Sequence, residues 1–180
     1  MKKFLVLALL LAVCACAVPA VAAKKETTDD LLRSRAAVVW IGGKQIGDLM
    51  VGATAKLYFQ FIDNKLADAI YAEPTSFPDD ILWNASYIDK ATRAKCNLVI
   101  LIYKTMDPWI FDPMKITVNG TPLDKKRVYS SLLAIPTGKI ASDVDGVIAF
   151  GVSKAACRPG STLVFGYEQY KAELIVPGKK

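Results

Sequence analysis

The chain has 180 residues, 53% of them hydrophobic, and 23 Lys and Arg against 17 Asp and Glu give it a formal net charge of +6. It contains no histidine, which excludes Ser-His-Asp and Cys-His catalytic sets and any histidine-ligated metal site. The basic residues are scattered rather than gathered with aromatic residues, so we expect no nucleic-acid binding. We also expect no catalytic residues, no metal site and no cofactor, because no complete motif for any of them occurs.

The first 23 residues have the pattern of a signal peptide. Lys2 and Lys3 form a basic start, Phe4–Val18 is apolar, and Ala20-Val21-Ala22 is typical of a cleavage site. A retained membrane anchor is the alternative, but the apolar run is shorter than the roughly 20 residues that span a bilayer. We therefore predict a periplasmic or secreted bacterial protein that loses residues 1–23 and then has no integral membrane span.

The cysteines divide between the leader and the mature chain. Cys14 and Cys16 lie in the leader, and either would carry the lipid if the protein were a bacterial lipoprotein, although the residues before them depart from the usual signal. Removal of the leader leaves 21 basic against 17 acidic residues, a net charge of +4. In an exported protein we expect Cys96 and Cys157 to form a structural disulfide; two buried thiols or a redox pair are the alternatives.

The predicted elements begin with a short helix or linker at residues 24–35, where Thr28 is the expected cap and two aspartates suit the first turn. From residue 36 onward, hydrophobic residues recur with a period of two. Residues 55–61 alternate apolar and more polar side chains, as a strand with one buried face does. Residues 96–103 form a nearly continuous apolar run, which is typical of a strand buried on both faces.

Turn signals separate the strands. Asn119-Gly120 is the strongest, since both residues tolerate the positive φ angles of a tight hairpin. Pro122 restricts the returning strand to a sheet edge or a bulge. Asp79 and Asp80 are expected in a turn before a strand that begins at Ile81. The predicted strands are 38–41, 46–51, 55–61, 81–88, 96–103, 115–118, 128–135, 147–152, 163–167 and 170–176.

About ten short strands without a helix between them predict an all-β fold, an antiparallel two-sheet β-sandwich over residues 36–177, followed by a disordered basic tail at 178–180. A barrel is the alternative. An immunoglobulin-like architecture is a further candidate, because Cys96, Trp109 and Cys157 follow the order of the core residues of such domains. Cys96 begins its strand, however, and Trp109 follows a proline, so we take no residue role from that analogy.

One segment carries candidate ligand-binding residues, namely Asp107, Trp109, Phe111 and Asp112. Two X-Pro steps hold it extended. Carboxylates beside aromatic rings are a combination that binds sugars or cations. The alternative is a rigid crossover whose aromatic rings fill one end of the sandwich.

The sequence therefore predicts an exported, non-catalytic β-sandwich that acts as a binding or structural module in the cell envelope or extracellular space, with an unknown protein or glycan as its partner. One alternative is an assembly or chaperone-like protein that accepts a partner's strand at a sheet edge. The other is a sugar-binding protein or a carboxylate-based hydrolase that uses Asp107, Asp112 and Trp109.

Overall fold

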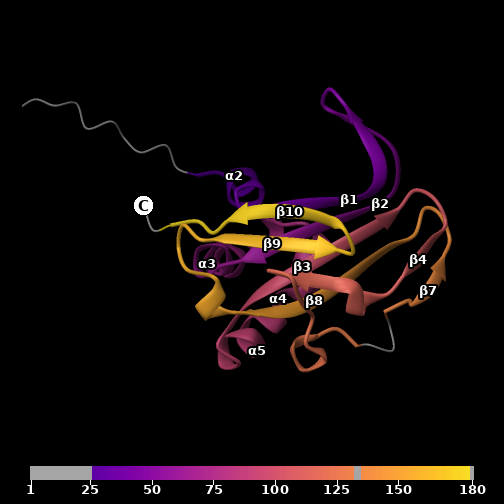
Figure 1. The fold of residues 1–180 in the computed structure, drawn as a ribbon. Coiled ribbons are helices and arrows are strands. Elements are labelled where there is room, and N and C mark those ends of the chain that lie inside the picture. The colour runs from indigo at the N-terminus through magenta and orange to yellow at the C-terminus, as the bar shows by residue number, and fades with distance from the viewer. Residues whose placement is uncertain (1–25, 132–134, 179–180) are drawn as a thin grey trace, which may run out of the picture.

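A computed structural model describes residues 26–131 and 135–178, and over these residues the chain is mostly β, with 45% strand and 27% helix (Figure 1). All strand pairs between these residues are antiparallel, and none of the sheets is closed. The predicted leader, with Cys14 and Cys16, lies outside the described residues. Among the helices of the described part, none has the length and apolar character needed to cross a membrane.

Two four-stranded sheets and one small sheet make up the β structure. The first sheet has the spatial order β1 (Ala36–Ile46), β2 (Leu49–Ile62), β3 (Cys96–Thr105) and β8 (Asp145–Ser153). The second has the order β10 (Tyr170–Ile175), β9 (Thr162–Tyr167), β5 (Ile116–Val118) and β6 (Thr121–Pro122). The small sheet pairs β4 (Trp109–Phe111) with β7 (Gly138–Ile140).

The two four-stranded sheets share one hydrophobic core, which we call the shared core. Along β2, Leu57, Phe59 and Phe61 are completely buried in it, which confirms the predicted alternation. Phe59 stacks on Phe165 of β9 with ring centroids 4.7 Å apart. Full burial of side chains of this size stabilises the fold by about 1.5–3 kcal/mol each, so this contact between the sheets is a large contribution.

A second core lies on the other face of the first sheet, where three helices pack against it: α3 (Asn64–Ala72), α4 (Asp79–Ala85) and α5 (Tyr87–Arg93). We call these helices the helical layer; Figure 1 shows α4 and α5 beside β3 and β8. Along β3, Leu98 and Ile100 face the helical layer, whereas Val99 and Leu101 face the shared core. The apolar run at residues 96–103 is therefore buried on both faces, as predicted.

The strand predicted at residues 81–88 is wrong, because this segment belongs to α4 and α5. Pro78 stands at the N-cap of α4, and Asp79 and Asp80 occupy its first turn, where carboxylates interact favourably with the helix dipole. Ile81 and Ile88 then face the second core. Both faces of the expected strand were partly apolar, a pattern that short helices packed on a sheet also produce. The fold is consequently mostly β rather than all-β.

Two further strand predictions are corrected. Residues 46–51 contain the turn between β1 and β2 rather than one strand. At 128–135, the described residues contribute only one isolated bridge, from Val128 to Phe150, and residues 132–134 lie outside the described part. The segment touches the middle of β8 only briefly, where the N–H groups of Tyr129 and Ser130 both donate to the Ala149 carbonyl.

The local signals at the chain's other turns are mostly confirmed. Asn119 and Gly120 have φ angles of 51° and 76° between β5 and β6, and Pro122 lies in the edge strand. The N-terminal helix α2 (Thr28–Arg33) is present but shorter than expected. Thr27 caps it, not Thr28, through a capping box with Asp30.

Candidate functional site

The predicted ligand segment is β4 with its flanks, and its aromatic rings lie in the shared core. Trp109 is only 8% exposed, its ring centroid lies 4.8 Å from that of Phe111, and both rings contact Tyr167. Ile110, between them, is 70% exposed, as strand alternation requires. Protein atoms therefore occupy the aromatic faces, which favours the alternative that these rings fill the core.

The two aspartates of this segment have structural contacts of their own. The Asp112 carboxylate accepts a hydrogen bond from the Met114 N–H at 2.9 Å, and the Asp112 N–H donates to the Tyr167 hydroxyl at 3.0 Å. Burial raises the pKa of the Tyr167 phenol, and this hydrogen bond partly offsets the rise. The Asp107 N–H donates to the Thr54 carbonyl at 3.1 Å, so that end of the segment braces β2. Within residues 26–131 and 135–178, no three acidic or cysteine side chains gather as a metal site requires.

The predicted disulfide is not formed in the structure, where Cys96 and Cys157 are both free, buried thiols. Cys96 lies with Leu98 on the helical side of β3, whereas Cys157 belongs to the shared core on the opposite face. A disulfide needs its two Cβ atoms about 4 Å apart and directed toward each other. Burial raises the pKa of the Cys157 thiol, and the neighbouring Asn97 amide offsets part of that rise, so the thiol is neutral near pH 7.

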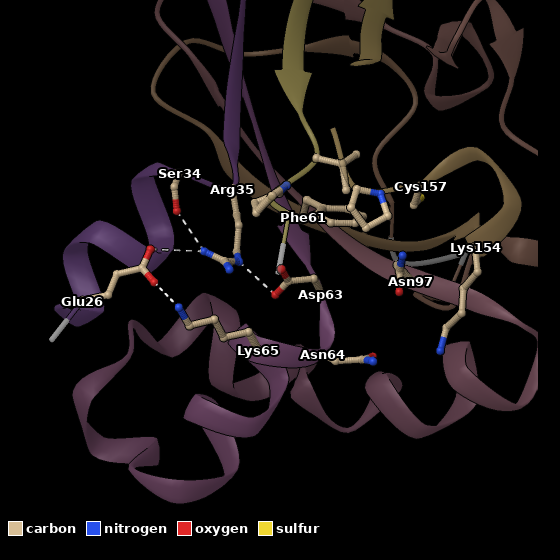
Figure 2. Close-up of a pocket in the computed structure, with 14 residues that line it drawn as sticks. Glu26, Ser34, Arg35, Phe61, Asp63, Asn64, Lys65, Asn97, Lys154 and Cys157 are labelled. Carbon is tan, nitrogen blue, oxygen red and sulfur yellow. Dashed lines mark hydrogen bonds and ion pairs between the residues drawn. The ribbon is translucent and has the colours of Figure 1, made fainter. Parts of the chain in front are cut away.

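A pocket of about 730 Å³ lies at the end of the first sheet where β1 and β3 begin and β2 and β8 end (Figure 2). We call it the sheet-end pocket. This volume is within the usual range for small-molecule sites. Its principal polar lining residues are Glu26, Arg35, Asp63, Asn64, Lys65, Asn97 and Lys154.

Arg35, which immediately precedes β1, is the buried centre of the pocket's polar wall. It is 3% exposed; its Nε donates to Asp63 Oδ1 at 2.8 Å and its Nη1 donates to Ser34 Oγ at 2.8 Å and to the Leu31 carbonyl at 3.2 Å. Glu26 lies 3.7 Å from Nη1 and also pairs with Lys65. Loss of one partner from such a buried pair costs about 3–5 kcal/mol, so this network holds the pocket wall in one geometry.

Asp63 has a second role because it is the N-cap of α3. Its Oδ1 also accepts a hydrogen bond from the Leu66 N–H at 2.8 Å. The same carboxylate therefore joins the buried guanidinium to the start of the helix, which places Asn64 in the pocket lining. Figure 2 shows the Arg35 guanidinium between the carboxylates of Glu26 and Asp63, and Lys154 and Asn97 on the other side of the pocket.

The second candidate site is a hairpin formed by the outer ends of β1 and β2, residues 42–53, which we call the projecting hairpin. In Figure 1 it extends away from the rest of the molecule. Its tip is a two-residue turn, Gly47–Asp48, closed by the pair Ile46 and Leu49. Gly47 has a φ of 59°, which the first position of a type II′ turn requires. Ile46, Leu49 and Val51 are each more than half exposed.

The base of the projecting hairpin is a β-bulge. Ile41 pairs with Ala55 and Gly42 with Ala53, so Thr54 has no partner on β1. The Thr54 carbonyl instead accepts hydrogen bonds from the N–H groups of Met106 and Asp107. The hairpin is thus anchored at its base, and its apolar tip lies beyond the part of β2 that pairs with β3, which starts at Ala55.

Protein-family models, curated proteins and solved structures give no match to this chain. The support for both candidate sites therefore comes from the geometry of this structure alone.

The sheet-end pocket carries no motif of contiguous residues. The sheet-end pocket takes Arg35, Asp63, Asn97 and Lys154 from four separate strand ends, which only the topology brings together. The projecting hairpin did have a local signal that was missed. Apolar residues on both sides of Gly47–Asp48 are the pattern of a two-residue hairpin with an exposed tip.

Proposed function

We propose that the protein is an exported, non-catalytic binding module that docks onto a partner protein in the cell envelope or extracellular space through the projecting hairpin. The leader pattern at residues 1–23 supports export. One observation carries the docking proposal: Ile46, Leu49 and Val51 place exposed apolar side chains close together on an element that extends away from the body. Clustered apolar exposure of this kind is typical of interaction sites.

The energetics of the hairpin support the same proposal. A two-stranded ribbon is at best marginally stable in water, and the tip gains nothing from apolar side chains that remain hydrated. Leu49, at 70% exposure, gains its full burial energy only against another molecule. A groove on the partner that covers the tip would supply the missing burial.

Strand acceptance is the second candidate function. The part of β2 before Ala55 has no pairing with β3, so the outer edges of the hairpin strands carry backbone groups outside the sheet ladder. Such edges are templates for a partner's strand. In this mode the backbone of the ribbon, rather than its apolar tip, makes most of the contact.

We further propose that the scaffold of this module is a two-sheet sandwich with an added helical layer. The stacking of Phe59 on Phe165 and the core shared by both four-stranded sheets support the sandwich. The insertion of α3 to α5 between β2 and β3 has no counterpart in immunoglobulin domains, which connect their strands without such a layer. The immunoglobulin-like variant of the proposal therefore has less support than a sandwich in general.

The test uses the purified mature protein, immobilised and exposed to an envelope extract of the producing cells. We expect a specific partner to bind the wild type and to be lost from the double variant Ile46→Ser/Leu49→Ser. The matched control, Ile110→Ser/Ile175→Ser, changes two apolar residues that are at least as exposed on average and lie away from the hairpin, and it should retain the partner. All variants should unfold within about 0.5 kcal/mol of the wild type, because the altered side chains are exposed.

A third variant separates the two candidate functions. Ile46 and Leu49 close the turn as a hydrogen-bonded pair, so the N–H of Gln45 points outward from the ribbon. Gln45→Pro removes that donor together with the hydrogen bond from the Gln45 Nε2 to the Gly47 carbonyl at 3.2 Å, and Gln45→Ala, which removes only the latter, is its control. Loss of the partner with Gln45→Pro alone supports strand acceptance, whereas retention supports docking through the tip; equal recovery by all variants contradicts both.

A further inference from the structure

The sheet-end pocket has the charge and shape of a small-molecule site that is separate from the projecting hairpin. We propose that it binds a small monocarboxylate with an apolar body. The residues that carry this inference are Arg35, Lys154, Asn64 and Asn97 on its polar side and Phe61 and Val176 on its apolar side.

The charge balance of the lining favours an anion with one negative charge. Arg35, Lys65 and Lys154 face two carboxylates, those of Glu26 and Asp63. Arg35 and Lys65 pair with these carboxylates, but Lys154 pairs with no carboxylate among the described residues. The lining therefore has one uncompensated positive charge, which one carboxylate neutralises and a dianion such as phosphate exceeds.

Polar donors surround that charge. The side chains of Asn64 and Asn97 line the same part of the pocket as Lys154, and Figure 2 shows all three on the side away from Glu26. Both amides can donate hydrogen bonds to a carboxylate oxygen. Hydrogen bonds to an ionised acceptor are about twice as strong as neutral ones, so this set discriminates a carboxylate from an amide of the same shape.

Arg35 adds a rigid donor from the pocket's polar wall. Its Nε and Nη1 are held by Asp63, Ser34 and Leu31, and among the described residues its Nη2 has no hydrogen-bond partner. Because the other nitrogens fix the plane of this buried guanidinium, Nη2 needs no reorganisation to meet a ligand.

An apolar wall completes the site. Phe61 and Val176 are buried members of the shared core that also line the pocket, together with Pro159. A ligand with only polar groups would leave this wall in contact with water. A carboxylate attached to an aromatic or branched aliphatic group matches both sides of the pocket at once.

The test titrates isotope-labelled mature protein with benzoate and, separately, with its neutral isostere benzamide, and follows amide NMR signals. Benzoate should shift the side-chain amide signals of Asn64 and Asn97 saturably, with a Kd on the order of 1 mM for so small a probe. Benzamide should bind at least about tenfold more weakly, since it lacks the charge. Equal affinity for the two probes, or no saturable shift at either asparagine, would overturn the proposal.

Substitutions of exposed lysines should change affinity without changing the stability of the fold. Lys154→Gln should weaken benzoate binding about tenfold, Lys154→Arg should retain it, and Lys139→Gln, an exposed lysine outside the pocket, should leave it unchanged. An unchanged Kd in Lys154→Gln contradicts the inference. The double variant Ile46→Ser/Leu49→Ser should bind benzoate like the wild type, so failure of the pocket and failure of the docking hairpin remain distinguishable.

Discussion

Trp109 and Ile110 are neighbours in β4 with opposite environments, since one ring is packed among Phe111 and Tyr167 and the other side chain faces water. Trp109→Ala should therefore lower the free energy of unfolding by about 3–5 kcal/mol, the usual cost of removing a large core side chain. Ile110→Ala is the matched control and should change it by less than about 0.5 kcal/mol. Urea unfolding measures both; a Trp109→Ala effect as small as that of the control would place the ring outside the core.

The reactivity of the two cysteines distinguishes the free thiols of the structure from the disulfide that the sequence predicts. Because Cys96 and Cys157 are buried on opposite faces of the first sheet, both should resist iodoacetamide in the folded protein and both should be alkylated in urea without any reductant. Intact mass spectrometry counts the labels. A mass lower by two protons, with labelling only after reduction, would show that the bridge forms.

The Cys157 thiol makes the free energy of unfolding depend on pH. Burial raises the pKa of Cys157 above its ordinary value, so the folded state keeps this proton at a pH where the unfolded chain has lost it. Its contribution to stability is therefore complete below the unfolded pKa of about 8.5 and declines as the pH rises above it. Cys157→Ala should reduce the loss of stability between neutral and alkaline pH; an unchanged loss would argue against this cause.

At the scale of elements, the strands were predictable where burial is regular, and α2 was predictable from its polar start, but the helices of the helical layer were not. The alternation in β2 and the apolar run in β3 follow directly from one covered face and two covered faces. Residues 64–93 form three α-helices of nine residues or fewer, too short for a clear period of 3.6. Their helical state depends on packing against β2, β3 and β8, which the local sequence does not contain.

Two glycines near the base of the projecting hairpin, Gly43 and Gly52, should differ in how well they tolerate substitution by alanine. A Cβ on Gly43 would lie 2.8 Å from the Ala53 nitrogen and 2.9 Å from the Val51 carbonyl oxygen, whereas a Cβ on Gly52 would meet nothing within 4 Å. The two residues have similar φ angles, 77° and 70°. Gly52→Ala should therefore cost only the backbone strain of about 1–2 kcal/mol, and Gly43→Ala should cost at least about 1 kcal/mol more.

Amide hydrogen exchange in residues 44–51 measures this difference, because the hairpin can open without global unfolding. The wild type and Gly52→Ala should show more protection than Gly43→Ala. Equal loss of protection in the two variants would mean that the close approach of the two strands at Gly43 does not hold the hairpin.

For the whole molecule, the sequence indicated the class of fold better than the location of its sites. Mostly antiparallel β structure follows from patterning along each segment, but the sheet-end pocket depends on Arg35, Asp63 and Lys154 meeting at one end of a sheet. Of the residues that the sequence offers for ligand binding, Trp109 fills the shared core, whereas Asp107 has an exposed side chain and contacts Thr54 through its backbone N–H alone. Polar and aromatic residues in a sequence indicate a functional site only once the exposure of their side chains is known.

Site-specific photocrosslinking in the producing cells tests most directly the proposed docking of a partner protein on the tip of the projecting hairpin. The full chain would carry a photoreactive amino acid in place of Leu49 or, as the control, in place of Ile110, which is equally exposed at 70%. We predict one discrete covalent adduct from position 49, lost when Ile46 and Val51 are changed to serine, and no such adduct from position 110. The absence of an adduct at position 49, or the same adducts at both positions, would contradict the claim.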